Sequence, residues 1–301
     1  MNHQNIAIVF VPGIRLKPPP EEHGLQLRRC LEAGVTRAGG SAAEVAAIGE
    51  AFSLVGWSHA FYGEHGDITV DLPGIERLLR GQDLEADDLR EASSFSRRIV
   101  STLYALVDRF PVLGRNFSTR RMQTRVQEVQ RYFDNTGRAA GAARKLVADA
   151  IRQAWLNKQR VLLIGHSFGS VIAYDTLWEL SREDLMDRVD MFLTMGSPLT
   201  MSYIRQRLKG AGLPEAERFP TCIRRWVNVT AIGEVTSLDR KLGHCFAKMP
   251  TLGLVESIDD DLGLINQFHG PDGLNVHKCY GYFASLLAGK ELLDWYKGAR
   301  R

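Results

Sequence analysis

The sequence VLLIGHSFGS, from Val161 to Ser170, joins three structural signals without a spare residue. Its first four apolar residues predict a buried strand, and the apolar-periodic segment 170–180 predicts a helix. Between them stands Gly-His-Ser-Phe-Gly, a GxSxG pattern centred on Ser167. A serine in so tight a strand-to-helix turn adopts strained backbone dihedrals, and the two glycines remove Cβ atoms that would clash. The pattern therefore predicts a nucleophilic Ser167, the alternative being an ordinary serine in a glycine-rich turn.

Length and composition limit the fold and the partners. At 301 residues the chain suits one large α/β domain or two small ones. A hydrophobic content of 45% and a charged content of 24% are ordinary for a soluble globular protein. The net charge of +3 is small for this length and does not indicate a nucleic-acid-binding surface. Because no repeat or linker interrupts the chain, we expect a single domain over residues 1–301.

Cysteine spacing and hydropathy bear on location and cofactors. The four cysteines are widely spaced and include no CxxC pair, so we expect buried thiols rather than a disulfide framework or a zinc site. The N-terminal apolar run is too short for a spanning helix and lacks the basic leader of a signal peptide. These features predict a cytoplasmic protein without a metal site at its cysteines.

The order of the remaining segments predicts the fold class. Strands are expected at 6–11, 52–62, 190–195, 225–231 and, more weakly, 252–258, and helices at 21–34, 42–50, 204–208, 277–287 and 291–296. Strands that alternate with helices predict a mostly parallel sheet covered on both faces. The predicted class is therefore α/β, with a mostly parallel sheet flanked by helices.

A block of helices interrupts this alternation between about residues 71 and 157. Apolar residues recur there at helical spacing, so the block is either a large crossover or an inserted cap. Between Arg97 and Arg131 it contains eight arginines and only two acidic residues. This basic face could make weak contact with an anionic membrane surface. The alternative, which we favour, is a solvated face balanced by the acidic residues of segment 83–91.

A nucleophilic serine needs a histidine base. After a GxSxG turn of this kind, the acid and then the histidine are expected to follow the serine in the chain. The candidates for the histidine are therefore His244, His269 and His277. His277 lies just before the last predicted helices, where such a loop is expected. His269, in a Gly/Pro-rich loop, is its nearest competitor, and His244 lies too close to the preceding strand.

The carboxylate that orients this base is expected at the carboxyl end of a parallel strand. The loop after the strand 225–231 offers Glu234 and Asp239, of which Glu234 is slightly favoured. Asp272 and the acidic run 259–261 are less well placed.

An oxyanion hole requires two backbone N–H groups aimed at the developing charge. One is expected from Phe168, directly after the nucleophile. The other is expected from the loop after the first strand, where Pro12 cannot donate and Ile14 or Gly13 must.

Five segments, in the order IVFVPGI, GHSFGSVIAYD, FLTMGSPL, WVNVTAIGEV and NVHKCYGYF, resemble the lipase/esterase branch of the α/β-hydrolase superfamily. They are similar in particular to intracellular bacterial serine hydrolases related to inositol-deacylase-like lipases. The resemblance spans nearly the whole chain apart from residues about 66–155, and the serine turn and the GSPL segment are its more specific motifs.

The resemblance implies an α/β-hydrolase fold with a helical, cap-like insertion. In the family the first strand usually ends in His-Gly, where this chain has Pro12 and Gly13, and the acid is usually Asp before Val, where this chain has Glu234. The family histidine precedes a tyrosine-bearing helix, which matches His277 and Tyr280.

The implied activity is acyl transfer from a small-molecule or lipid ester through an acyl-enzyme on Ser167, with water as the acceptor and no metal or organic cofactor. The alternatives are a thioesterase, an acyltransferase, or a catalytically silent scaffold that binds a ligand or a partner. The sequence leaves the oligomeric state open.

Overall fold

The computed structural model describes residues 5–81, 120–135, 138–183, 186–234 and 241–298. Within them a six-stranded sheet has the order β2-β1-β3-β4-β5-β6, with every neighbouring pair parallel. Its strands are β1 (Ile6–Val11), β2 (Phe52–Leu54), β3 (Arg160–His166), β4 (Val189–Met195), β5 (Ile223–Ala231) and β6 (Ser257–Leu264). A short antiparallel pair, β7 (His269–Gly270) and β8 (Gly273–Leu274), lies outside this sheet.

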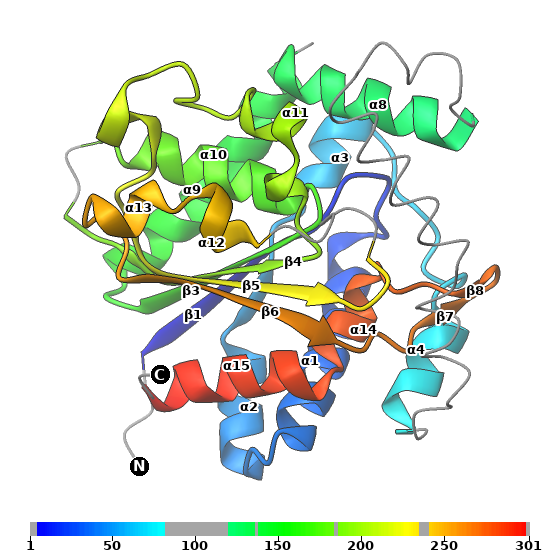
Figure 1. Cartoon of the computed structure of the whole chain (residues 1–301). Coiled ribbons are helices and arrows are strands. Elements are labelled where there is room, and N and C mark those ends of the chain that lie inside the picture. Colours follow the sequence, from blue (N-terminus) through cyan, green and yellow to red (C-terminus); the bar gives the residue numbers. More distant parts are fainter. Residues whose placement is uncertain (1–4, 82–119, 136–137, 184–185, 235–240, 299–301) are drawn as a thin grey trace.

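Helices cover both faces of the sheet (Figure 1). One face carries α3 (Trp57–Tyr62), α8 (Arg120–Phe133), α9 (Ala139–Leu156), α10 (Gly169–Leu180), α11 (Ser202–Arg205), α12 (Leu242–Cys245) and α13 (Lys248–Thr251), with the 3₁₀ turns η3 (Pro198–Thr200) and η4 (Glu215–Arg218). The other face carries α1 (Pro20–Arg37), α2 (Ala42–Glu50), α4 (Leu72–Leu79), α14 (Cys279–Phe283) and α15 (Leu286–Lys297).

The central strands supply both cores because successive side chains point to opposite faces. In β1, Val9 and Val11 enter the core under α9 and α10, whereas Ile8 and Phe10 enter the core under α1 and α15. Burial on both faces explains why these strands read as continuous apolar runs rather than as alternating patterns. The predicted α/β class with a mostly parallel sheet is confirmed.

Two predicted strands differ from the structure. Segment 52–62 forms the three residues of β2 and then α3, because Trp57 and Phe61 stand one helical turn apart and pack edge-to-face with ring centroids 5.6 Å apart. The strand expected at 252–258 instead begins at residue 257. Its sequence, SIDDDLGL, lacks an apolar pattern because β6 is an edge strand with half-exposed side chains.

The predicted helical block 71–157 is partly described. Its last helix, α9, packs on β1, β3 and α10, and so forms part of the layer that covers the sheet. Residues 82–119, which hold much of the predicted Arg-rich face, lie outside the described residues. Of the described arginines of that face, Arg131 stacks on the ring of Phe61, with its guanidinium carbon 4.4 Å from the centroid.

The strand order indicates that a ligand would bind at the carboxyl ends of the sheet strands. The chain passes from β1 to β2 on one side and later returns to β3 on the other. Helices leave neighbouring strands in opposite directions at such a switch point, and a crevice opens at the carboxyl ends of the two strands. Val11 and Gly165 are paired at this end, so the loops after β1 and β3 meet there.

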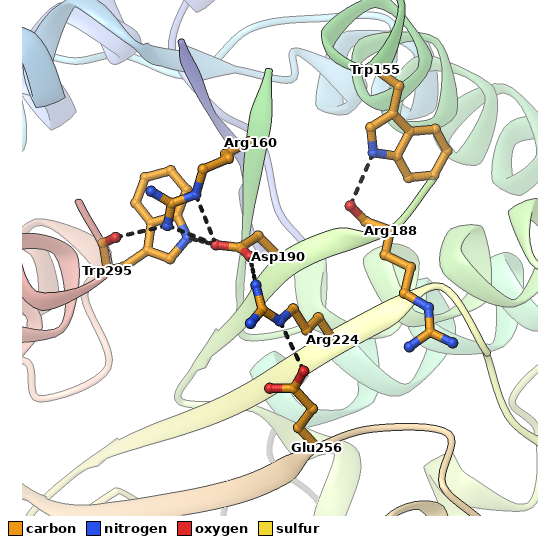
Figure 2. A network of polar contacts seen from close by, with 7 residues as sticks. All are labelled: Trp155, Arg160, Arg188, Asp190, Arg224, Glu256 and Trp295. Atoms are coloured by element: carbon orange, nitrogen blue, oxygen red, sulfur yellow. Dashed lines mark hydrogen bonds and ion pairs between the residues drawn. The ribbon is translucent and has the colours of Figure 1, made fainter. Parts of the chain in front are cut away.

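At the amino ends of the strands, Asp190 joins three elements of the fold (Figure 2). Its carboxylate accepts hydrogen bonds from Arg160 Nη2 at 2.9 Å, from Arg224 Nη1 at 3.0 Å and from Trp295 Nε1 at 2.7 Å. These donors come from β3, β5 and α15. Burial alone would raise the pKa of Asp190, but the bonds to Arg160, Trp295 and Arg224 outweigh it and hold the pKa below its usual value of 3.8.

We expect Asp190→Asn to lower the free energy of unfolding by about 2 kcal/mol, because the variant loses the charge that these donors share. A group whose folded-state pKa is depressed stabilises the protein above its unfolded pKa and loses that effect as the pH falls through the folded value. The difference between wild type and variant in urea unfolding should therefore shrink below about pH 4. Arg188→Ala is the control, since this exposed side chain has no hydrogen-bond or ion-pair partner among the described residues. An equal loss of stability in both variants would contradict the assignment.

Candidate active site

Ser167 occupies the tight turn between β3 and α10. Its φ of 52° lies in the left-handed region, which is costly for a residue with a side chain. The N–H of Ser167 donates to the carbonyl of Met195 in β4 at 2.8 Å, which ties the turn to the neighbouring strand.

The glycines of the turn are required by close backbone contacts. A Cβ on Gly165 would lie 2.6 Å from the Cα of Ser170, and one on Gly169 would lie 2.2 Å from the carbonyl oxygen of Val11. Both distances are far below van der Waals contact, so larger residues at either position would push α10 away from β3 and β1.

Two further serines, Ser170 and Ser197, support the turn through hydrogen bonds. The hydroxyl of Ser170 donates to the carbonyl of Ser167 at 2.6 Å and lies 2.7 Å from the hydroxyl of Ser197. Ser197 in turn caps η3 by accepting from the N–H of Leu199. The GSPL segment after β4 is therefore a structural support for the serine turn.

His277 lies in the loop between β8 and α14, next to Ser167. Its Nε2 is 2.8 Å from the Oγ of Ser167. The loop is held by two further contacts, from the N–H of His277 to Asn275 Oδ1 at 3.2 Å and from Nε2 of His166 to the carbonyl of His277 at 2.8 Å. Burial and the nearby His277 keep the pKa of His166 well below its usual value, so His166 is neutral and supplies one N–H to this bond.

Glu234 follows β5 and completes the chain of contacts. Its Oε2 is 2.7 Å from Nδ1 of His277, and its side chain is only 2% exposed. When the Nδ1–H donates to this carboxylate, Nε2 carries a lone pair toward the Ser167 hydroxyl. The structure thus brings together Ser167, His277 and Glu234, three of the candidate residues, in one continuous hydrogen-bonded line.

Tyr282 of α14 fixes the carboxylate from behind. Its hydroxyl donates to Glu234 Oε2 at 3.1 Å and accepts from the N–H of Ala231 at 3.0 Å. Burial, with the charge of Glu234, raises the pKa of Tyr282 well above its usual value, so the phenol stays protonated and can donate. Tyr280, the tyrosine that the resemblance matched, lies on the same helix, and its buried hydroxyl has no hydrogen-bond partner among the described residues.

The other predicted candidates lie elsewhere or cannot be placed. His269 is in β7, with Nδ1 at 3.1 Å from the carbonyl of Gln267, and His244 is in α12. Asp239, the alternative acid, lies outside the described residues. Asp272 lies between the short strands β7 and β8.

The acidic run 259–261 belongs to β6, where it has structural roles. Asp259 pairs with Arg225 at 3.2 Å. Asp260 accepts from the amide of Asn228 at 2.8 Å and from the N–H groups of Leu242 and Gly243 at 2.9 and 2.8 Å. Asp261 accepts from the N–H of Gly263 at 3.1 Å.

Two backbone segments beside Ser167 could form an oxyanion hole. The N–H groups of Phe168, Gly13 and Ile14 have no hydrogen-bond acceptor among the described residues. Gly13 lies directly against Ser167, since a Cβ on Gly13 would stand 2.9 Å from the Cβ of Ser167. The loop after β1 thus brings its free N–H groups close to Ser167 even though Pro12 supplies none.

Side chains on both sides fix this loop. Lys17 Nζ donates to the carbonyl of Ile14 at 3.1 Å, and the N–H of Arg15 donates to the hydroxyl of Tyr62 at 2.8 Å. Burial lowers the pKa of Lys17 to about 8. On the far side, Trp57 Nε1 donates to the carbonyl of Pro12 at 2.8 Å.

No protein-family model, curated protein or solved structure matches this chain. In the part of the chain that the structure describes, no three His, Cys, Asp or Glu residues gather as a metal site would require. None of the described helices is both long and apolar enough to cross a membrane.

Three supporting residues were not found from the sequence. Tyr282 was not distinguished from Tyr280, although alternate positions on a short helix face different ways. His166 was visible only as a variable position of GxSxG. Gly196 has a φ of 54°, and a Cβ there would lie 2.9 Å from the Tyr282 hydroxyl and 3.1 Å from Glu234 Oε2. Its position directly after the predicted strand 190–195 was the sequence feature that could have pointed to Gly196.

We expect Gly196→Ala to lower the free energy of unfolding by about 1–3 kcal/mol. An alanine is strained at the positive φ of this position, and its methyl group would displace Glu234 or Tyr282. Gly212→Ala is the matched control, since its added Cβ would meet nothing within 4 Å. Thermal or urea unfolding measures both. Equal stability of the two variants would mean that the Gly196 contact is not a tight one.

Proposed function

We propose that this protein is a serine hydrolase that cleaves carboxylic esters through an acyl-enzyme on Ser167, within an α/β-hydrolase fold. One observation carries the proposal: the continuous line from the Ser167 hydroxyl through both ring nitrogens of His277 to the Glu234 carboxylate, at 2.8 and 2.7 Å. Each distance is within hydrogen-bond reach for proton transfer. The position of this line at the switch point of a parallel sheet supports it further.

The geometry suits acyl transfer in two steps. Nε2 of His277 takes the hydroxyl proton as Ser167 Oγ attacks the ester carbonyl, and the same proton then passes to the departing alkoxide. Water attacks the acyl-enzyme in the second step, giving its proton to His277 and releasing the carboxylic acid and free Ser167. Glu234 remains ionised throughout and stabilises the imidazolium that forms in each step.

The free N–H groups of Phe168 and of Ile14 or Gly13 would stabilise the oxyanion of each tetrahedral intermediate. Donors of this kind are aimed before the reaction begins, so they need no reorganisation when the charge develops. Lys17 and Tyr62, which fix the loop after β1, would contribute by holding these donors in place.

Within the helical segment 71–157 we propose a cap-like insertion that determines which esters reach Ser167. The helices α4 and α9 are excepted, because they pack in the layers that cover the two faces of the sheet. A small-molecule or lipid ester is the proposed substrate. A catalytically silent binding scaffold is the rival that the following experiment tests.

A fluorophosphonate probe and p-nitrophenyl esters of several acyl lengths test the nucleophile together. We expect the probe to add one phosphonyl group to Ser167 with loss of fluoride, detected by mass spectrometry, and Ser167→Ala to abolish both labelling and turnover. Ser53→Ala is the control, because the hydroxyl of this exposed serine on β2 bonds to the Ile8 carbonyl and to no other described residue. Wild-type protein that is neither labelled nor active on any ester would support the silent scaffold.

Glu234→Gln tests the acid. The amide preserves the shape of the side chain but cannot hold the productive tautomer of His277, so we expect kcat to fall by about 10³–10⁴ with KM little changed. Glu234→Asp should retain more activity than Glu234→Gln, because the shorter side chain keeps its charge. If Glu234→Gln has wild-type kcat, the orienting acid is another residue, and Asp239→Asn becomes the variant to measure.

A further inference from the structure

A cavity of about 760 Å³ lies between α10, the segment 202–219 and the segment 241–248. These elements lie on the same side of the sheet (Figure 1). None of Ser167, His277 and Glu234 lines it, so it is separate from the candidate active site. Its volume falls within the range of pockets that hold small organic ligands.

The floor of the cavity is apolar and belongs to the core. Tyr174, Leu208, Phe219 and Phe246 line it and are between 1% and 6% exposed. The rings of Tyr174 and Phe246 lie with centroids 5.5 Å apart, and that of Phe219 stands 6.4 Å from Phe246. A rigid aromatic floor of this kind can pack against an apolar or aromatic body.

The rim of the cavity is cationic. Arg205, Lys209, Arg218, Lys241 and Lys248 line it, and no acidic residue is found among its described lining residues. Lys209 pairs with Glu179 at 3.2 Å. The other four cations have no carboxylate partner among the described residues.

Four cations without carboxylate partners around one concave space favour an occupant with more than one negative charge. A phosphate group carries about two and accepts hydrogen bonds on three oxygens, whereas a carboxylate carries one charge. The rim therefore fits a phosphate better than a carboxylate.

Tyr174 adds a neutral donor to this charge pattern. It is 1% exposed, lines the cavity, and its hydroxyl has no hydrogen-bond partner among the described residues. Burial and the neighbouring Asp175 raise the pKa of Tyr174, whereas the charge of Arg218 lowers it, so that guanidinium lies near enough to act on the phenol. A tyrosine hydroxyl in the wall of a cavity can donate a hydrogen bond to a ligand in place of water.

We propose that this cavity binds a phosphate-bearing organic molecule whose apolar or aromatic body packs on the floor while its phosphate meets the cationic rim. The site is independent of ester hydrolysis at Ser167. Lipid-like and nucleotide-like phosphates share this chemistry, and the two probes below distinguish them.

Calorimetric titration of the full-length protein with octyl phosphate, below its micelle-forming concentration, and with adenosine monophosphate tests the proposal. Neither probe contains a carboxylic ester, so turnover does not interfere. We expect one-to-one binding of at least one probe, weaker binding of inorganic phosphate and of octanol, and an affinity that falls with added salt because the rim is solvent-exposed.

The double variant Arg218→Ala, Lys241→Ala should lower this affinity by at least about tenfold, and Tyr174→Phe, which keeps the ring, by several-fold. Arg188→Ala with Lys290→Ala removes the same net charge from exposed sites outside the cavity and should change the affinity less than about twofold. Ser167→Ala should bind like the wild type whether or not Ser167 is a nucleophile.

Failure of both probes to bind, equal binding of octanol, or an equal loss in the two double variants would overturn the proposal. Inorganic phosphate that binds as tightly as both probes would overturn the role of the apolar floor.

Discussion

The close approach of α10 to the carboxyl ends of β1 and β3 is the constraint on which the rest of the site depends. Without Cβ atoms at positions 165 and 169, the helix begins almost in contact with both strands. The single residue left to reverse the chain is Ser167, and it must take a positive φ. That strain is tolerated because the N–H of Ser167 bonds to β4 and its carbonyl bonds to Ser170. A relaxed turn would retract the hydroxyl from the open edge of the sheet.

The same constraint determines where the partners of Ser167 can stand. Parallel strands end at one edge, so the loops after β4 and β5 lie beside the serine turn in the order of the sheet. Gly196 follows β4 and leaves room for the Glu234 carboxylate after β5. Tyr282 then links that carboxylate to the backbone of β5 itself. Glutamate has a longer and more flexible side chain than aspartate, and the hydrogen bond from Tyr282 fixes the position of its carboxylate.

The features predictable from the sequence are those with strong local signals. The serine turn and the buried strands beside it follow from apolar runs and glycines, and the candidates Glu234 and His277 follow from their positions in the chain after Ser167. The signals failed where tertiary contacts override composition. β6 contains three consecutive aspartates in an edge strand. The first two accept hydrogen bonds from Arg225, Asn228 and two N–H groups of α12, and the third accepts from the N–H of Gly263. α3 contains strand-favouring aromatic residues, but in the helix Trp57 and Phe61 pack on each other and Trp57 Nε1 donates to the Pro12 carbonyl.

The net charge of the chain does not reveal how its charged residues are distributed in space. A net charge of +3 over 301 residues gives no indication of an anion-binding site. The five cations of the cavity beside α10 come from residues spread between positions 205 and 248, and folding brings them around one aromatic floor. Repulsion among them costs stability, and an exposed rim reduces that cost through solvent and salt without abolishing it. Lys209 pairs with Glu179, but the other four cations have no carboxylate partner among the described residues, so a bound anion would supply the charge that offsets this cost.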